Sequence, residues 1–185
     1  MTKLFKSCIG AALLASLVGC QSLDTRAIKK LAHVQPKDNA RVYCLGVENC
    51  EFERLDQTVI VSAETGRVTR AAIEQGLVRL RTKRISDANS LYLSVPKGQH
   101  EVVIRYYPIS PERAETFHIF HNFQASQQYQ FVMYRKRTKQ HRNLLSASSP
   151  DPLCVAIQRN RQTIRRFCRA YNVETGLGEF KEQKI

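Results

Sequence analysis

The stretch Leu91–Tyr106, LYLSVPKGQHEVVIRY, decides the fold class of this chain. Apolar residues occupy alternate positions on both sides of a central Pro96-Lys97-Gly98 segment: Leu91, Leu93 and Val95 before it, and Val102, Ile104 and Tyr106 after it. Alternation with a period of two places such side chains on one face of an extended strand. Proline fixes φ at the first turn position, and glycine adopts conformations that other residues resist. The stretch therefore predicts two β-strands around a tight turn, in a position to pair with each other.

The same period of two recurs along the chain. It predicts further strands at residues 41–45, 58–63, 77–83, 117–123 and 129–134, whereas 68–73 are ambiguous. In 77–83 the alternation sets Val78 apart from Arg79, whose side chain is expected on the solvated face. Many short strands separated by turn residues are typical of a sandwich or a barrel. The predicted fold is mainly β with little helix, in the form of a small antiparallel β-sandwich.

Two interpretations are open for residues 153–171. In one, Ile164, Phe167, Cys168 and Tyr171 form a helical stripe. In the other, 153–157 and 164–171 form a hairpin that places Cys154 opposite Cys168. The β-carbons of a cross-strand pair lie about 4.5–5.5 Å apart, which is close to disulfide reach and favours the hairpin.

The N-terminus has the layout of a secretory signal. Lys3 and Lys6 precede an apolar run over 9–18, which is shorter than the roughly 20 residues that a membrane-spanning helix needs. The run leads into Leu17-Val18-Gly19-Cys20, which resembles the lipobox of bacterial lipoproteins. This resemblance implies cleavage before Cys20 and acylation of its sulfur. In Gram-negative lipoproteins an Asp at the next position resembles an inner-membrane retention signal, so Gln21 favours the outer membrane, facing the periplasm.

The predicted domain organisation follows from these patterns. Residues 1–19 are a lipoprotein signal peptide, 20–39 a lipid-anchored tether with room for one or two helical turns at 25–31, 40–172 the β-sandwich domain and 173–185 a flexible C-terminal tail. A hydrophobic content of 43% over 185 residues excludes a disordered, collagen-like or coiled-coil chain. A domain of ~150 residues buries about 70% of its unfolded surface, so a substantial core is expected.

The six cysteines have different predicted fates. Cys8 leaves with the signal peptide and Cys20 carries the lipid. Four cysteines then remain in an oxidising compartment, where disulfides form: Cys44, Cys50, Cys154 and Cys168. Three pairings are possible, and we favour the local ones, 44 with 50 and 154 with 168. A zinc site is the alternative, but the Cys-x₅-Cys and Cys-x₁₃-Cys spacings lack the short turn such sites use, so no metal or cofactor is predicted.

Two segments together resemble PEGA-type domains and related bacterial lipoproteins. They are residues 91–104 and FQASQQYQF at 123–131. The shared pattern is a strand, a Pro-x-Gly-x-His turn, a strand of alternating Val and Ile, and an Ala-Gly-x-x-Tyr entry into another strand. Ser126 stands where the family often has Gly. The resemblance covers residues 91–135 and implies a small β-sandwich without catalytic residues.

Few residues in the sequence suggest catalysis. His118-x-x-His121 is the only close histidine pair, and residues three apart on a strand point to opposite faces. No Gly-x-Ser-x-Gly elbow, His-Glu-x-x-His helix or phosphate-binding glycine loop is found in the sequence. An enzyme is therefore the least favoured class.

Positive charge is the strongest remaining signal. The chain has 29 Lys and Arg against 16 Asp and Glu, a formal net charge of +13. The cations gather in three clusters: Arg79, Arg81, Lys83 and Arg84; Arg135, Lys136, Arg137, Lys139, His141 and Arg142; and Arg159, Arg161, Arg165, Arg166 and Arg169. Such clusters either form solvated faces or recognise an anion.

The predicted function combines the anchor with the charge. Behind a lipid anchor in the bacterial cell envelope, the anion is not nucleic acid but lipopolysaccharide, peptidoglycan or an acidic envelope protein. We predict a non-enzymatic lipoprotein that binds such a component through Arg135, Lys136, Arg137, Lys139 and Arg142. The alternative is a structural or assembly lipoprotein that acts by protein–protein contact in an envelope or secretion complex.

Overall fold

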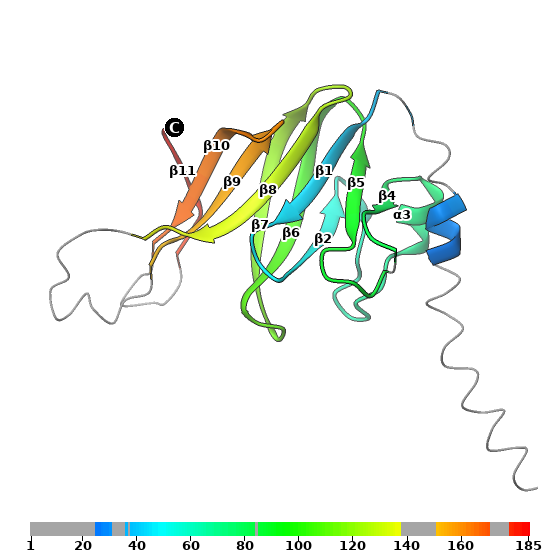
Figure 1. Ribbon diagram of the computed structural model, residues 1–185, viewed down its shortest axis with the longest axis horizontal. Helices are drawn as coiled ribbons and strands as arrows, with labels where there is room; N and C mark the ends of the chain where they lie inside the picture. The colour runs from blue at the N-terminus through cyan, green and yellow to red at the C-terminus, as the bar shows by residue number, and fades with distance from the viewer. Residues whose placement is uncertain (1–24, 31–35, 37, 84, 138–150, 171–177) are drawn as a thin grey trace, which may run out of the picture.

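The computed structural model confirms a mainly β domain (Figure 1). It describes residues 25–30, 36, 38–83, 85–137, 151–170 and 178–185. The strands are β1 (Ala40–Leu45), β2 (Asn49–Leu55), β3 (Thr58–Val59), β4 (Val78–Leu80), β5 (Leu91–Val95), β6 (Gly98–Ser110), β7 (Arg113–Phe123), β8 (Gln128–Arg135), β9 (Leu153–Arg159), β10 (Gln162–Arg169) and β11 (Lys181–Gln183). Helical residues are 25–30 and α3 (Arg70–Glu74).

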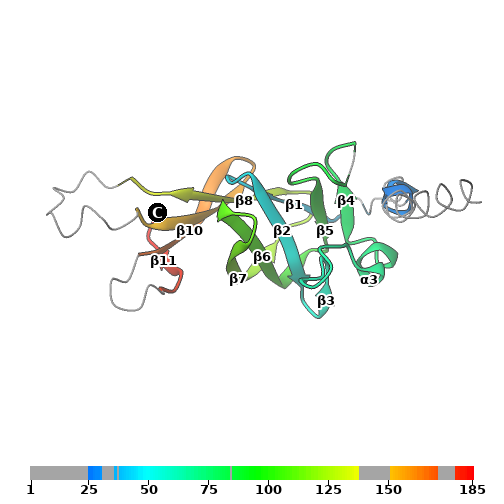
Figure 2. The ribbon, with the colours of Figure 1, turned by 90° about the horizontal axis from the view of Figure 1, so that it is seen from below.

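The strands form two sheets that pack face to face (Figure 2). The larger is seven-stranded, in the order β11-β10-β9-β8-β1-β5-β4, and the smaller is four-stranded, in the order β3-β2-β6-β7. Aromatic side chains fill the space between them. Tyr106 of β6 is fully buried, and its hydroxyl donates a hydrogen bond to the Phe131 carbonyl of β8 at 3.1 Å. The rings of Phe123 and Tyr129 make an edge-to-face contact across the same interface, 5.0 Å apart.

One strand pair departs from the predicted antiparallel arrangement. β1 runs parallel to β8, with Val42 opposite Tyr129. Parallel neighbours need a long crossover connection, and here it is residues 46–127, which include the whole four-stranded sheet. A period of two is common to parallel and antiparallel strands, so the sequence pattern does not distinguish them.

The turn at Pro96 and Lys97 joins the two sheets and does not close a hairpin. β5 pairs with β1 and β4, whereas β6 pairs with β2 and β7, so the prediction that β5 and β6 pair is wrong. Both strands still point their apolar residues at one core, and Val95 and Val102 are fully buried. The neighbour that β6 takes instead, β2, is a strand the sequence pattern missed, because its register shifts between Phe52 and Arg54 and breaks the alternation.

Both predicted disulfides are present. β9 and β10 form the predicted hairpin, with Cys154 directly opposite Cys168 and their Cα atoms 4.1 Å apart. The Cys44–Cys50 bond, with Cα atoms 6.1 Å apart, joins β1 to β2 and so links the two sheets. All four sulfurs are engaged, so none of them is a free thiolate for zinc.

Residues 25–30 form a helix that packs onto the domain, in a segment predicted to be tether. Ile28 is fully buried and belongs to the same hydrophobic core as Ala72 and Ile73 of α3. Burial of one isoleucine side chain contributes about 1.5–3 kcal/mol, which holds so short a helix in place. The tether prediction is therefore wrong for these residues, whereas residues 20–24 lie outside the described part of the chain.

The C-terminus adds an edge strand where a flexible tail was predicted. β11 pairs with β10, with Glu182 opposite Phe167, and the ring of Phe180 packs edge-on against Phe117 at 5.4 Å. The tail prediction is wrong for residues 178–185, while 173–177 lie outside the described residues. All three side chains of β11 are exposed, so the strand carries no apolar alternation that could reveal it.

Candidate functional site

The two sheets differ in the acidic residues that their strands carry. Strands β1, β4, β5, β8, β9 and β10 of the seven-stranded sheet contain no Asp or Glu. Their arginines are Arg41, Arg79, Arg135, Arg159, Arg165, Arg166 and Arg169. The strands of the four-stranded sheet instead contain the glutamates Glu51, Glu53, Glu101 and Glu115. Apart from Glu182 of the edge strand β11, the strands of the seven-stranded sheet thus carry only basic charges, whereas those of the four-stranded sheet carry both signs.

The arginines of β10 that face inward at the edge of the sandwich are neutralised. Arg165 forms an ion pair with Glu182 of β11 at 2.7 Å, and its Nη1 donates to the Phe120 carbonyl of β7. Arg169 forms an ion pair with Glu115 of β7 at 2.6 Å. These two cations of the predicted 159–169 cluster stabilise the edge between the sheets, so they are structural.

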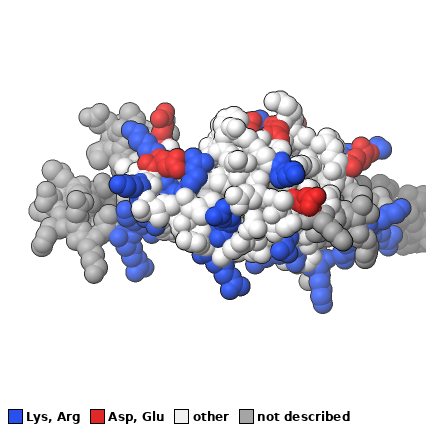
Figure 3. Space-filling model, turned by 90° about the horizontal axis from the view of Figure 1, so that it is seen from above, with Lys and Arg blue, Asp and Glu red and all other residues white. Residues whose placement is uncertain are grey.

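Two other arginines of the larger sheet, Arg41 and Arg166, have no acidic partner within the described ranges. Arg41 is exposed, and its neighbours Ala40 and Val42 point into the core, so Arg41 lies on the outer face of the sheet. Arg166 pairs in register with Ala156 and lies on the same outer face. In Figure 3, Lys and Arg side chains project along the lower edge of the molecule, and the Asp and Glu side chains in view lie above that edge. Figures 2 and 3 view the molecule from opposite sides, so this edge is the side of the seven-stranded sheet.

The predicted binding cluster lies at the end of β8. Arg135, Lys136 and Arg137 are all exposed there. Arg135 Nη1 donates to the Asp151 carbonyl at 3.2 Å, and the Lys136 backbone N–H donates to the Pro152 carbonyl at 2.9 Å. These bonds hold the segment beside the start of β9 and leave the cationic groups of Lys136 and Arg137 toward solvent. Lys139 and Arg142 lie outside the described residues.

Together these residues define what we call the basic face: Arg41, Arg135, Lys136, Arg137 and Arg166. An aromatic pair lies near Arg41, because the rings of Tyr43 and Tyr92 stack 5.0 Å apart on adjacent strands. Burial raises the pKa of Tyr43, and the positive charges of Arg41 and Arg81 oppose that rise. The stack therefore sits within the field of two arginines.

Arg79 is buried, so the prediction of a solvated face for the 79–84 cluster is wrong for this residue. Its residue is only 2% exposed, and its Nη1 donates to the Val78 carbonyl at 2.9 Å. Burial lowers the pKa of its guanidinium. Arg81 and Lys83 are exposed as predicted, and Arg84 lies outside the described residues.

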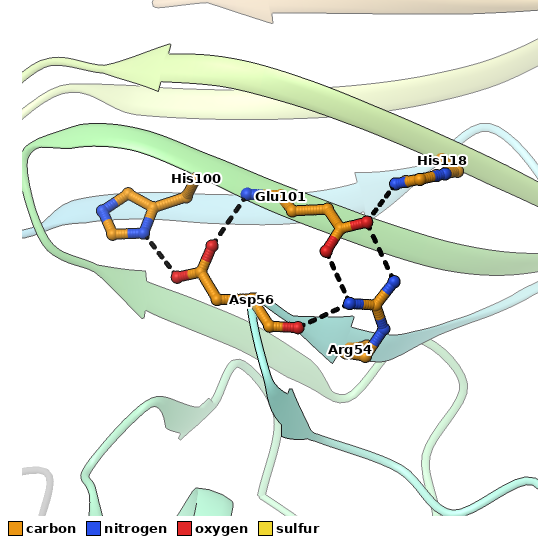
Figure 4. A network of polar contacts seen from close by, with 5 residues as sticks. All are labelled: Arg54, Asp56, His100, Glu101 and His118. Carbon is orange, nitrogen blue, oxygen red and sulfur yellow. Dashed lines mark hydrogen bonds and ion pairs between the residues drawn. The ribbon is translucent and has the colours of Figure 1, made fainter.

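A network of ion pairs lies on the outer face of the four-stranded sheet (Figure 4). Arg54 holds the Glu101 carboxylate with two hydrogen bonds, of 2.5 and 2.9 Å, and His118 Nε2 contacts the same carboxylate. The Arg54 guanidinium lowers the pKa of Glu101. Burial alone would raise the pKa of Asp56, but a 2.7 Å hydrogen bond with His100 and one from the Glu101 N–H lower it overall.

This network is predicted by no motif in the sequence. Its members come from three strands and one turn, and only strand register brings them together. Each carboxylate faces a cation or a histidine, and no Ser, Cys or Thr nucleophile contacts the two histidines in the described structure. The network can neutralise charge and stabilise the sheet.

His121 lies on the opposite face of β7 from His118, as the strand spacing predicted. Its ring packs between Phe123 and Tyr129, at centroid distances of 4.9 and 5.2 Å. Burial and the charges of Arg165 and Arg159 lower the pKa of His121 to about 4. It is a neutral core residue near pH 7 and not a ligand shared with His118.

A cleft of about 380 Å³ lies between β2, the end of β6 and residues 85–91. Its walls include Glu51, Arg67, Asp87 and Tyr107. The Tyr107 hydroxyl donates to Glu51 at 3.0 Å, and burial raises the pKa of that tyrosine. The Tyr107 hydroxyl and the Glu51 carboxylate in this wall are therefore bonded to each other.

Three further observations bear on function. No group of metal-ligating side chains is found in the part of the chain that the structure describes, and no helix there is long and apolar enough to cross a membrane. No protein-family model, curated protein or solved structure matches the chain. Cys20 lies outside the described residues and no family model matches residues 91–135, so the lipid anchor and the PEGA resemblance stay predictions.

Proposed function

We propose that this protein is a lipid-anchored lipoprotein of the bacterial cell envelope, facing the periplasm from the outer membrane, that binds an anionic envelope component through the basic face. The observation that supports it is the separation of charge between the sheets. Arg41, Arg166 and the end of β8 lie on a sheet whose main strands contain no acid. Arginine suits bidentate contact with phosphate or carboxylate, the anions of lipopolysaccharide and peptidoglycan.

The basic face is better suited to an anionic polymer than to catalysis. Its cations are spread over β1, β8 and β10 and do not converge on a cavity. Repeated anionic groups along a polymer can reach several of them at once, which raises avidity without any deep pocket. The contribution of each contact falls with salt, because exposed charges are screened over about 8–10 Å.

Binding is tested with the acylated protein in detergent and two anionic probes, purified peptidoglycan sacculi and lipopolysaccharide. We expect Arg135→Glu/Lys136→Glu/Arg137→Glu to weaken co-sedimentation with one of them by about tenfold or more, since each cation contributes ~1 kcal/mol near an anionic surface. The matched control, Arg67→Glu/Lys97→Glu/Arg113→Glu, reverses three exposed cations outside the basic face and changes the net charge equally. Unchanged binding of the 135–137 variant to both probes would contradict the proposal.

The anchor is tested by the intact mass of the protein from its native membrane, with and without reductant. We expect a chain that begins at Cys20 with a diacylglyceryl group, and a mass gain on reduction that accounts for both disulfides. A mature protein that begins elsewhere would contradict the predicted localisation.

A structural or assembly function is the second candidate. The end of β6 presents Ile109, which is 64% exposed and lies between Pro108 and Pro111. An exposed apolar side chain between rigid prolines suits a protein partner better than an anionic polymer. Salt-insensitive binding of a defined envelope protein, lost in Ile109→Ser, would favour this function.

A further inference from the structure

A second basic surface lies on the helix over residues 25–30. Arg26, Lys29 and Lys30 are exposed there, whereas Ile28 is fully buried in the core. Residues at i, i+3 and i+4 share one face of a helix, so the three cations project together from the side opposite the packed side. None of them has an ion-pair partner among the residues that the structure describes.

This helix and the end of β8 lie at opposite ends of the molecule. Figure 1 shows the helix beside α3 and β4, whereas β8 ends toward the other end of the long axis. The sheet order agrees, because β1 and β5 separate β8 from β4. The helix cations are therefore a different surface from the basic face.

The position of the helix in the sequence ties it to the anchor, a step that rests on the proposed function. Only residues 21–24 lie between Cys20 and Thr25. Five Cα steps of about 3.6 Å span at most roughly 18 Å. Ile28 is buried in the core and holds the helix on the domain. The segment that connects the anchor to the domain therefore ends at Thr25, whereas the tether predicted from the sequence extends to residue 39.

We propose that Arg26, Lys29 and Lys30 form a lipid-headgroup site, which binds the phosphates of the leaflet that holds the acyl chains of Cys20. A short link keeps the helix next to that leaflet, and basic side chains are attracted to an anionic surface within about a Debye length. An acyl chain together with a basic patch also binds a membrane more stably than a chain alone.

The site fixes how the domain stands on the membrane. The α3 and β4 end faces the bilayer, and the end of β8 points away from it. The basic face then meets a component that lies beyond the anchoring leaflet, which favours peptidoglycan or an acidic protein over the headgroups beneath the domain.

Lysine footprinting of the full acylated protein tests this site. The protein is reconstituted in vesicles of phosphatidylcholine alone and in vesicles where phosphatidylglycerol replaces part of it, and acetylation is followed by mass spectrometry. We expect acetylation of Lys29 and Lys30 to be about threefold slower on the anionic vesicles and the difference to disappear at high salt. Lys97 and Lys136, which are also exposed, report any general change in reactivity.

A single charge reversal sharpens the test and leaves both reporter lysines in place. Arg26→Glu is expected to reduce the protection of Lys29 and Lys30 at least by half, whereas the matched control Arg113→Glu, an exposed cation outside both basic surfaces, leaves it unchanged. Equal acetylation of the two lysines on both vesicle types would overturn the site. Slower acetylation of Lys136 instead would show that the other end faces the bilayer and would also overturn it.

A measurement on the same sample distinguishes failure of the headgroup site from failure of the proposed function. Its intact mass shows whether Cys20 is acylated before any footprint is taken. An acylated protein without protection at Lys29 and Lys30 overturns only the headgroup site. A protein without the lipid overturns the proposed anchor and, with it, the geometry on which the site depends.

Discussion

The two sheets of the sandwich differ in what their arginines face. In the four-stranded sheet, Arg105 contacts Glu51 at 3.1 Å and Arg54 contacts Glu101 at 2.5 Å, so cations and acids from neighbouring strands compensate one another. In the seven-stranded sheet, Arg41 and Arg166 have no acidic partner among the residues that the structure describes. Compensated charges stabilise a fold, whereas uncompensated ones are available to a partner. The difference shows that a cluster of cations in the sequence gains meaning only when strand pairing is known.

The largest effect is expected where a compensated charge is also buried. Arg105 is 7% exposed, contacts Glu51 and donates to the Val61 carbonyl. Arg105→Met leaves the Val61 carbonyl without this donor and Glu51 without its cationic partner, and is expected to lower the free energy of unfolding by about 2–3 kcal/mol. The control Arg41→Met, on the larger sheet, is expected to change it by less than about 0.5 kcal/mol. Urea unfolding of both variants with intact disulfides measures the contrast.

Equal stability losses in these two variants would contradict the comparison between the sheets. They would mean that the contacts of Arg41 contribute as much to the free energy of unfolding as those of Arg105. A large loss in Arg41→Met alone would reverse the assignment and make the larger sheet the compensated one.

A smaller effect is expected from the histidine between the sheets. The pKa of His121 is about 4 in the folded protein and near 6.5 in an unfolded chain. Between these values the unfolded chain binds a proton that the folded protein excludes, so stability falls as pH drops from about 6.5 to 4. After allowance for partial solvent access, the expected loss is about 1–2 kcal/mol.

His121→Phe should remove this part of the pH dependence and leave stability near pH 7 little changed. The measurement is the free energy of unfolding at a series of pH values for both proteins. His118→Phe is the matched control on the exposed face of the same strand, and its pH dependence should differ from that of His121→Phe. Parallel pH curves for the original protein and His121→Phe would contradict the assigned pKa.

The sequence predicts the strands better than their partners. Alternation located β1, β5, β7 and β8, since a half-buried strand has a period of two whichever neighbour it takes. It missed β2, where a bulge disrupts the period, and β11, whose side chains are all exposed. It also placed β5 and β6 in one sheet, because a Pro-Gly turn marks a change of direction but not whether the chain stays in the same sheet.

The candidate surfaces could be predicted only in part. The run at 135–137 is contiguous, so its three cations were visible in the sequence. Arg41 and Arg166 are far apart in sequence, and they share a face only because β1 and β10 belong to one sheet. The helix cations Arg26, Lys29 and Lys30 have helical spacing in the sequence, but their importance depends on Ile28 reaching the core, which no local pattern indicates.

The smallest change in stability is expected from a partly exposed ion pair of the four-stranded sheet, that of Asp56 with His100. The Asp56 side chain is 47% exposed, and its hydrogen bond with His100 is therefore solvent-screened. Asp56→Asn keeps an acceptor for the Glu101 N–H and tolerates the positive φ of 49° at this position. We expect a loss of about 0.5 kcal/mol or less near pH 6. Since the pKa of Asp56 is lowered in the folded protein, this contribution exists above about pH 4 and is lost as pH falls through the folded value.

Unfolding measured at pH 6 and pH 3, with Asp38→Asn as an exposed control, decides how far the comparison extends. If Asp56→Asn were as costly as Arg105→Met, exposed pairs would stabilise the smaller sheet as strongly as buried ones. The exposed cations of the larger sheet, which have no such partners, would then lower the stability of the domain. Binding of an anion to them would raise that stability. If the loss is small and disappears at pH 3, exposed charge is nearly neutral for folding on both sheets. The basic face could then keep its cations at little cost to stability, which is the condition under which a surface is free to be used for binding.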